Sequence, residues 1–491
     1  MGFILGAISR CLAGHVVRDE LNRCIDWPGG VQAEEVLVRR FTPRPQGRFD
    51  IEYAVRLGAT KSRFTQMQKP MDSNPWDPSV VTLYGRYPML DVETHGFESW
   101  PLKPTDSNPW ASPVSGVYVD IPTLNVTIHS MDQDPAFPQV GRCLDAGEMA
   151  SRIGDLLSRE SRNVTGPSAE SLCCEPVSFR RGRRFVVRYV ESNGPGPHRA
   201  WAGKCYANNR GKKLAERHRH LADHLASFGD GSVRVPRMLG YEPDLRMAVT
   251  EWSDVSAAGG FEPSDMLLAQ RSARVLAALQ SCPVLQLKDA NSQGYWNTLK
   301  RWCELIGALR PALADQAGEL LQQLADARRR FEPSRAVVTH GDFYESQIVI
   351  GKDATTILDL DTLAAGDRCA DVGNCLAHLW LWCLEHDHGF EYYTSLARAM
   401  LQEYESATEP VDESALAYYW AATLFRAGAL HAFRDRTAPY AAPLWAMVVP
   451  VLNKGRKALE PSRSDAPRLA QSQRAAITVV HTQRIHTNDA I

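Results

Sequence analysis

The chain has 491 residues, which exceeds what one compact core usually holds and predicts about three lobes of roughly 150 residues each. Apolar residues make up 44% and charged residues 23% of the sequence, fractions that are typical of a globular protein. The formal net charge is −2, so no basic excess points to nucleic acid or to an anionic membrane as a partner.

The apolar stretches and the cysteines favour a cytoplasmic protein. The apolar run at Met1–Ser9 ends at Arg10, which is too short for the hydrophobic region of a typical signal peptide. Cys375–Leu384, the most apolar later stretch, is also too short to span a bilayer. None of the eleven cysteines forms a Cys-x-x-Cys pair, so we expect reduced structural thiols.

Residues 1–150 are rich in β-branched and aromatic residues interrupted by proline. This composition predicts strands at Val36–Val38, Phe49–Val55, Val80–Tyr84 and Val117–Ile121. Within the same region Lys69–Trp76 recurs as Lys103–Trp110, with seven of eight positions identical. Asn-Pro disfavours helix and Asp-Ser-Asn favours turns, so both copies should be loops.

A second internal similarity links this region to the residues that follow it. Gly47–Val55 resembles Arg183–Val190, and Tyr84–Tyr87 parallels Ala202–Tyr206. Two stretches of strand in the same order suggest a degenerate duplicate of one β-rich lobe. Two unrelated hairpins with basic loops are the alternative.

The pattern becomes helical from about residue 260. Ser264 can cap a helix, and further helices are expected at Trp296–Ile306, Asp315–Arg329, Gly373–Leu384 and Ser414–Phe433. The expected order is therefore a β-rich segment over 1–150, a β-rich lobe over 151–256, a helical lobe over 257–460 and a disordered tail over 461–491.

A hairpin with oxygen-bearing side chains at its open end is the most informative stretch. Gln347–Ile350 and Thr355–Leu358 are strand-like, and four residues join them. Facing residues of a hairpin sit roughly 5 Å apart, so the Gln347 amide oxygen and the Asp359 carboxylate can converge on one small cation. Mg²⁺ prefers such oxygen ligands and completes its shell with water and phosphate oxygens.

Asp342 lies five residues before this hairpin, on a loop at its open end. Its carboxylate can there accept a proton from a hydroxyl that attacks a phosphoryl group held by the metal. A chance His-Gly-Asp beside a solvated hairpin tip is the alternative, and the residues alone leave both open.

The order of three motifs resembles the aminoglycoside phosphotransferase and choline kinase family of the protein-kinase-like superfamily. The motifs are His340-Gly-Asp342 with four residues before Gln347, then Ile357-Leu-Asp359-Leu-Asp361, then Gly366-Asp367 with Asp371-Val-Gly-Asn374. The resemblance covers roughly residues 170–460. It implies an α+β, bilobal protein-kinase-like fold, with a β-rich N-lobe and a helical C-lobe, preceded here by an extra β-rich N-terminal segment.

The resemblance also implies roles for the residues of the motifs. Asp342 corresponds to the catalytic base and Asp359 to the Mg²⁺ ligand, while Asp371 would brace the catalytic loop. The family has Asn where this chain has Gln347, which keeps the ligating oxygen on a side chain one methylene longer. This departure bears on the rate and the metal geometry more than on the fold.

The family binds ATP, and the resemblance implies further residues for it. Lys204 best matches the lysine that holds the phosphates, and Glu216 is the nearest carboxylate to pair with it, although 12 residues is a short separation for this fold. Glu251 and Trp252 would lie beside the adenine.

The leading hypothesis for the function is an ATP- and Mg²⁺-dependent kinase that phosphorylates a hydroxyl of a small alcohol, amino sugar or sugar. The alternative is a nucleotide-binding pseudokinase that acts as a scaffold through residues 1–150. A protein kinase is disfavoured, because only 12 residues separate Asp359 from Asp371 and leave no room for an activation segment. Candidate walls of the acceptor site are Tyr344, Glu345, Trp380, Trp382, Glu385 and Asp387.

Overall fold

A computed structural model of the chain describes its secondary structure and contacts. The described residues are 11–25, 32–43, 49–57, 80–87, 118–121, 126–129, 133–134, 136–160, 165–180, 182–192, 199–228, 231–253, 264–284, 287–290, 292–331, 336–434 and 437–460. Both copies of the repeated loop and the tail over 461–491 lie outside them. The chain divides into two compact units: Met1–Lys212, Leu239–Thr250 and Phe433–Asp435 form the first, and Lys213–Met238, Glu251–Ala432 and Arg436–Ile491 form the second.

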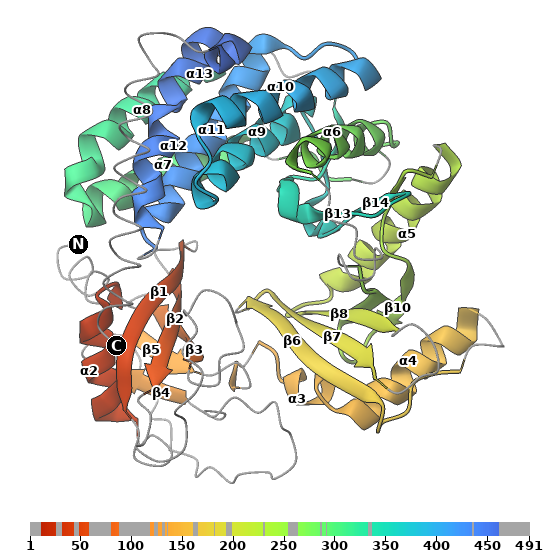
Figure 1. Cartoon of the computed structure of the whole chain (residues 1–491). Helices are drawn as coiled ribbons and strands as arrows, with labels where there is room; N and C mark the ends of the chain where they lie inside the picture. The colour runs from red at the N-terminus through yellow and green to blue at the C-terminus, as the bar shows by residue number, and fades with distance from the viewer. Residues whose placement is uncertain are drawn as a thin grey trace. The chain divides into compact units, whose positions relative to one another are not determined.

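The first unit is mainly β-structure with three described helices (Figure 1). Its elements are α2 (Gly14–Cys24), β1 (Ala33–Pro43), β2 (Phe49–Leu57), β3 (Val80–Tyr87), β4 (Tyr118–Ile121), β5 (Val126–His129), α3 (Val140–Cys143), α4 (Ala146–Glu160), β6 (Leu172–Arg180), β7 (Arg184–Glu191), β8 (Ala200–Tyr206), β10 (Met238–Glu242) and β11 (Met247–Glu251).

An antiparallel sheet in the order β1-β2-β3-β5-β4 forms the N-terminal part of this unit. The β-branched and aromatic residues of β2 bury Ile51, Tyr53 and Val55, as strand alternation requires. Helix α2 buries Val17 and Leu21. The predicted strands at Phe49–Val55 and Val80–Tyr84 are thereby confirmed, whereas α2 was not predicted.

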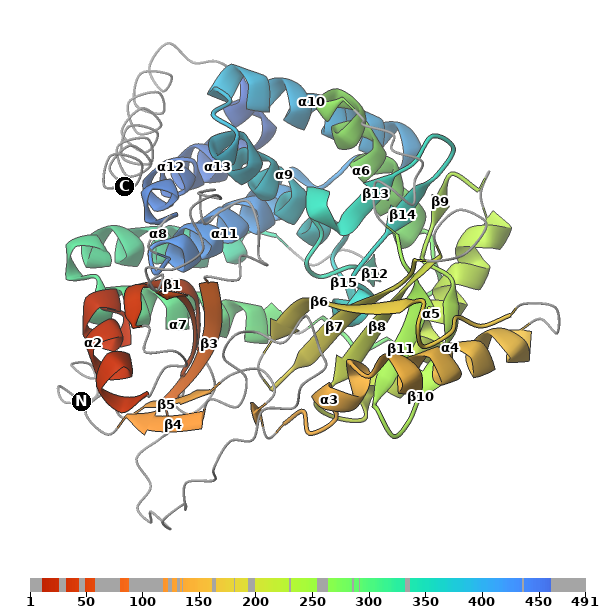
Figure 2. The same cartoon turned by 60° about the horizontal axis from the view of Figure 1, so that its bottom comes forward.

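A second sheet in the order β10-β11-β8-β7-β6 forms the rest of the unit (Figure 2). Its core includes Met149 and Ile153 of α4 together with Tyr189 of β7. Gly203 on β8 has to be glycine, because a Cβ atom there would lie 2.6 Å from the Tyr189 ring.

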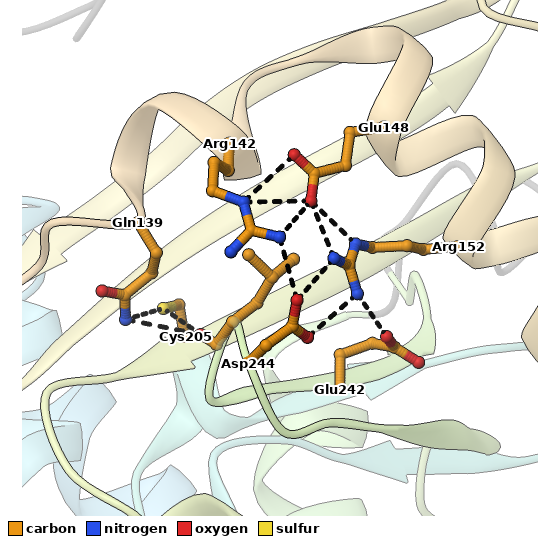
Figure 3. Close-up of polar contacts among 8 residues, drawn as sticks. Gln139, Arg142, Glu148, Arg152, Cys205, Glu242 and Asp244 are labelled. Atoms are coloured by element: carbon orange, nitrogen blue, oxygen red, sulfur yellow. Dashed lines mark hydrogen bonds and ion pairs between the residues drawn. The ribbon is translucent and has the colours of Figure 1, made fainter.

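A network of ion pairs ties α3 and α4 to the residues around the turn between β10 and β11 (Figure 3). The Arg152 guanidinium lies 2.8 Å from Glu148, 2.7 Å from Glu242 and 2.6 Å from Asp244. Arg142 contacts Glu148 and Asp244 as well. Arg152 and Arg142 lower the pKa of Asp244 to about 2, so both cations favour its ionised form.

The second unit is mainly helical. Its elements are α5 (Arg210–Phe228), β9 (Val233–Arg234), α6 (Asp265–Gln280), α7 (Ser292–Leu309), α8 (Ala314–Arg328), β12 (Val337–Thr339), β13 (Ile348–Ile350), β14 (Thr355–Ile357), β15 (Ala364–Gly366), α9 (Arg368–Glu385), α10 (Phe390–Ala407), α11 (Glu413–His431), α12 (Ala441–Ala446) and α13 (Val448–Lys454), with short 3₁₀ turns between them.

Helices α9 and α11 lie at the centre of this unit and approach each other closely at Gly373. A Cβ atom at this position would meet the Trp420 backbone nitrogen at 2.5 Å, so only glycine allows this approach. Ser264 caps α6 through a hydrogen bond from the Leu267 amide, as predicted. The predicted helices correspond to α6, α7, α8, α9 and α11.

The hairpin predicted from the sequence at Gln347–Leu358 is part of a three-stranded sheet. Strands β13 and β14 pair antiparallel, and β14 pairs in parallel with the short strand β9. The amide of Thr355 donates to the Ser232 carbonyl at 2.7 Å. The hairpin is therefore completed by a strand that lies far away in the sequence.

The predicted α+β class is confirmed: β-rich segments precede a helical lobe, and an extra β-rich segment stands at the N-terminus. Within the described residues, the structure contains no helix with the length and apolarity needed to cross a bilayer.

Candidate active site

The register of the β13–β14 hairpin brings Gln347 next to Asp359. Ile350 faces Thr355, and the amide of Leu358 donates to the Gln347 carbonyl at 2.8 Å. This is the pairing predicted from the sequence. One short hairpin therefore places the two candidate metal ligands close to each other, at its open end.

Asp359 adopts a left-handed backbone conformation, with φ of 53° and ψ of 55°. It stands at the start of a 3₁₀ turn over Leu360–Thr362. Aspartate is among the few non-glycine residues enriched in this region, and such conformations gather at functional sites. The turn takes the chain away from β14 directly after the carboxylate.

The oxygen donors of Gln347 and Asp359 fit a magnesium ion. Gln347 is 7% exposed, and its backbone N–H donates to the Tyr344 carbonyl at 2.9 Å. The backbone of Gln347 is thus hydrogen-bonded at both its N–H and its carbonyl. Neither bond uses the side-chain amide. An amide oxygen and a carboxylate form a hard donor set that suits Mg²⁺ with phosphate oxygens.

Asp371 braces the loop that carries Asp342. Its carboxylate accepts hydrogen bonds from the backbone amides of His340 at 2.6 Å and Gly341 at 2.9 Å. Burial raises the pKa of Asp371, while His340 and these two hydrogen bonds oppose the rise. Gly341 has a φ of 80°, and a Cβ atom there would lie 2.9 Å from the Thr362 carbonyl oxygen. The bracing role expected from the resemblance is confirmed.

His340 joins this loop to the strand that leads to Asp359. The imidazole is fully buried, and its Nε2 atom donates to the Leu358 carbonyl at 2.8 Å. The His340 carbonyl in turn accepts a hydrogen bond from the Thr362 hydroxyl at 2.6 Å. Both ends of the Asp359 turn are therefore bonded to the loop that precedes Asp342.

Asp342 lies beside an arginine that was not predicted from the sequence. Its carboxylate, 39% exposed, lies 3.7 Å from the guanidinium of Arg426 on α11. The neighbouring Asn374 of α9 donates to the Phe343 carbonyl at 2.7 Å. Asn374 belongs to the third motif, but Arg426 follows it by 52 residues and no spacing rule points to it.

The side chains proposed to line the acceptor site differ in exposure: Glu385 and Asp387 are exposed, whereas Tyr344, Glu345 and Trp382 are half-buried. Tyr344 stacks on His378 with 4.7 Å between the ring centroids, and Trp382 stacks on His386 at 4.4 Å. Trp380 is fully buried, and its indole N–H donates to the Pro443 carbonyl. The suggestion that Trp380 lines an acceptor site is therefore wrong, because its ring fills the core.

The residues expected near ATP are divided between the two units. Lys204 is half-buried on β8, opposite Val186, in the first unit. Glu216 is exposed on α5 in the second unit, so its pairing with Lys204 stays a prediction.

Glu251 ends β11 in an ion pair with Arg237, with 2.8 Å between the charged atoms. Trp252 follows it and is half-buried. Their place beside the adenine likewise stays a prediction.

Comparison with protein families agrees with the motifs. Residues 179–414 match the model of the phosphotransferase enzyme family. The matched segment begins in β6 and ends in α11. The match confirms the resemblance inferred from the sequence and supports a phosphotransferase activity. No curated protein matches the chain.

Several solved structures resemble the chain at low identity. An aminoglycoside-3'-phosphotransferase of type VIII is 20% identical, covers 56% of this chain and 98% of its own, and has a TM-score of 0.35. The choline kinase LicA from Streptococcus pneumoniae is 13% identical, with 62% and 99% covered and a TM-score of 0.37. An aminoglycoside phosphotransferase from Alicyclobacillus acidocaldarius is 16% identical, with 64% and 92% covered and a TM-score of 0.35.

Proposed function

We propose that this chain, whose residues 179–414 match the model of the phosphotransferase enzyme family, transfers a phosphoryl group from ATP to a hydroxyl of a small alcohol, amino sugar or sugar. Neither nucleic acid nor a membrane is part of the proposal, and a cytoplasmic location stays a prediction. The hydrogen bonds that join the Asp342 loop to the Asp359 turn carry the proposal.

In this mechanism Asp342 accepts the proton of the acceptor hydroxyl while the hydroxyl oxygen attacks the terminal phosphate of ATP, and ADP departs as the bond to that phosphate breaks. Asp359 and Gln347 would hold Mg²⁺, which would neutralise charge at the phosphate oxygens. Lys204 contacts the phosphates that stay on the nucleotide, with Glu216 as its partner, while Glu251 and Trp252 border the adenine. Asp371 and His340 keep the loop and the turn in place.

Two substitutions test the division of labour between base and metal ligand. Asp342→Asn should abolish phosphoryl transfer and leave ATP affinity within a few-fold, because the base contacts the acceptor. Asp359→Ala should weaken Mg²⁺-dependent ATP binding, because a ligand of the cation is lost. Transfer and ATP titrations measure both, and Asp353→Asn at the exposed hairpin tip is the matched control. Wild-type transfer by Asp342→Asn would remove Asp342 from the role of base.

Gln347 decides between a kinase and a pseudokinase, since the family has Asn at this position. Gln347→Asn should keep or raise activity, whereas Gln347→Leu, which lacks a ligating oxygen, should lose on the order of 100-fold. The rates are measured with ATP and a panel of alcohols, amino sugars and sugars. No turnover in the wild type or in either variant would favour the nucleotide-binding scaffold.

A further inference from the structure

Arg426 approaches the predicted base from outside the sequence motifs. Its Nη2 atom lies 3.7 Å from Oδ1 of Asp342 and 3.2 Å from Oδ1 of Asn374. The Arg426 side chain is 26% exposed and that of Asp342 is 39% exposed. A cation from α11 thus stands beside a carboxylate that solvent reaches.

Asn374 fixes the geometry of this contact. It is 7% exposed, and its Nδ2 atom donates to the Phe343 carbonyl, directly after Asp342 in the chain. With Nδ2 facing that carbonyl, Oδ1 faces the guanidinium of Arg426. One amide therefore holds both the backbone next to the base and the cation beside it, which is a connected polar network.

The close approach of α9 and α11 makes the contact possible. Gly373 precedes Asn374 on α9, and the missing Cβ atom lets the helix come within contact of the Trp420 backbone. Arg426 lies on α11, between one and two turns beyond Trp420. The helix crossing at this glycine thus brings the guanidinium to the catalytic loop.

We propose that Arg426 is a positioning residue that orients the Asp342 carboxylate toward the acceptor hydroxyl; this rests on the proposed function. A half-exposed aspartate has several side-chain orientations open to it, and a charge-assisted contact with a fixed guanidinium selects one of them. Catalysis is sensitive to such placement, since a misplaced group costs roughly 10- to 100-fold in rate.

The test compares Arg426→Gln, Arg426→Lys and Arg426→Ala with the wild type. Turnover of Mg²⁺-ATP is measured with water as acceptor and with the acceptor panel named above. Arg426→Gln should lose roughly 10- to 100-fold in kcat with the KM for ATP within about threefold, and Arg426→Lys should keep part of the rate. Added guanidinium ion should restore part of the Arg426→Ala rate, because the site is open to solvent.

Arg274→Gln removes a surface arginine that pairs with Glu403 and serves as the control, with wild-type rate and no response to guanidinium. Full kcat in Arg426→Gln, or an Arg426→Ala variant that binds ATP normally yet shows no rescue, would overturn the positioning role. A wild type without any turnover contradicts the proposed function itself, so the two failures are distinguishable.

The N-terminal sheet carries a second, independent inference. Read from the first strand, its order is β1-β2-β3-β5-β4, and the order of the second sheet is β6-β7-β8-β11-β10. The two orders coincide strand by strand, and a helix precedes each sheet, α2 in one case and α4 in the other. We infer that α2 and the strands β1 to β5 are a degenerate second copy of the β-rich lobe.

Matching side-chain contacts support the duplication. The Tyr53 hydroxyl donates to the Cys11 carbonyl at 2.8 Å, and the Tyr189 hydroxyl donates to the Cys143 carbonyl at 2.9 Å. All four residues are buried. The tripeptide Arg-Cys-Leu stands at 10–12 and again at 142–144, each time just before the helix.

The strand registers match as well, and they show how the copies diverged. Arg86 on β3 faces Asp50, whereas Lys204 on β8 faces Val186. At the position of Lys204 the first copy has Arg86, and at the position of Val186 it has Asp50, so the register places an acid and a cation opposite each other. We infer that the first copy, with an acid at this register position, has lost the binding of nucleotide phosphates.

Calorimetric titration with Mg²⁺-ATP tests this loss, and unfolding experiments test the shared architecture. We expect one ATP site per chain, weakened by Lys204→Ala and unchanged by Arg86→Ala. Tyr53→Phe and Tyr189→Phe should each lower the ratio of folded to unfolded protein, by roughly 5- to 30-fold. Two ATP sites would overturn the loss of binding, and a Tyr53→Phe variant as stable as the wild type would overturn the duplication.

Discussion

Glu345, three residues after Asp342, carries a carboxyl group in an unusual environment. One of its oxygens is buried and has no hydrogen-bond partner among the described residues. Burial raises the pKa of Glu345 to about 7, and the charge of Glu385 adds to the rise. The folded protein therefore holds a proton that the unfolded chain releases near its ordinary pKa of 4.5.

This difference predicts a pH-dependent stability. The contribution of Glu345 to the free energy of unfolding is fully present below pH 4.5 and is lost as the pH rises through about 7. The reason is that the carboxyl group ionises in the folded state at this pH, and a buried charge is unfavourable. Glu345→Gln should flatten the decline of the melting temperature between pH 5 and pH 8. Glu319→Gln, an exposed change on α8, is the control. An unchanged pH profile in Glu345→Gln would contradict the assignment.

At the level of elements, the crossing of α9 and α11 determines where several site residues stand. Asp371 and Asn374 of α9 lie on either side of Gly373, and Arg426 belongs to α11. A side chain at Gly373 would push against the α11 backbone, which cannot yield as a flexible side chain does. A shift of α9 would move the loop brace and the base network together.

Gly373→Ala should therefore destabilise the protein by about 1–3 kcal/mol and lower kcat. Gly307→Ala on α7, where a Cβ atom meets nothing within 4 Å, should instead stabilise it by about 0.5–1 kcal/mol through helix propensity. Urea denaturation of both variants measures the contrast. Equal stability of the two would show that α9 has room to move.

At the scale of the whole molecule, the sequence predicts what depends on local pattern. A composition rich in β-branched and aromatic residues identified β2, the cap at Ser264 with apolar residues near one face identified α6, and an almost wholly apolar segment identified α9. The hairpin register followed from a four-residue loop, which fixed Gln347 beside Asp359. Local rules suffice wherever the decisive contacts lie within about twenty residues.

The rest depends on tertiary contacts that no local rule contains. Arg426 reaches Asp342 only because two helices cross at one glycine. Helix α2 was missed because its apolar face is short, with Val17 and Leu21 as the buried residues of the segment. The pairing of Lys204 with Glu216 is likewise not determined by local pattern, because the two residues belong to different units.

The parallel pairing of β9 with β14 has a consequence for the order of folding. The β13–β14 hairpin closes over four residues, whereas Arg234 and Thr356, which also share a hydrogen bond, are 122 residues apart. Short loops close far sooner than long ones, because closure entropy grows with the length of the loop. In pulse-labelling hydrogen exchange, the Leu358 amide should gain protection before the Thr355 amide, which waits for the Ser232 carbonyl. The ligand-bearing turn would then form early in refolding and its outer edge late, so that a nascent chain acquires the Gln347–Asp359 pair before the sheet around it is complete.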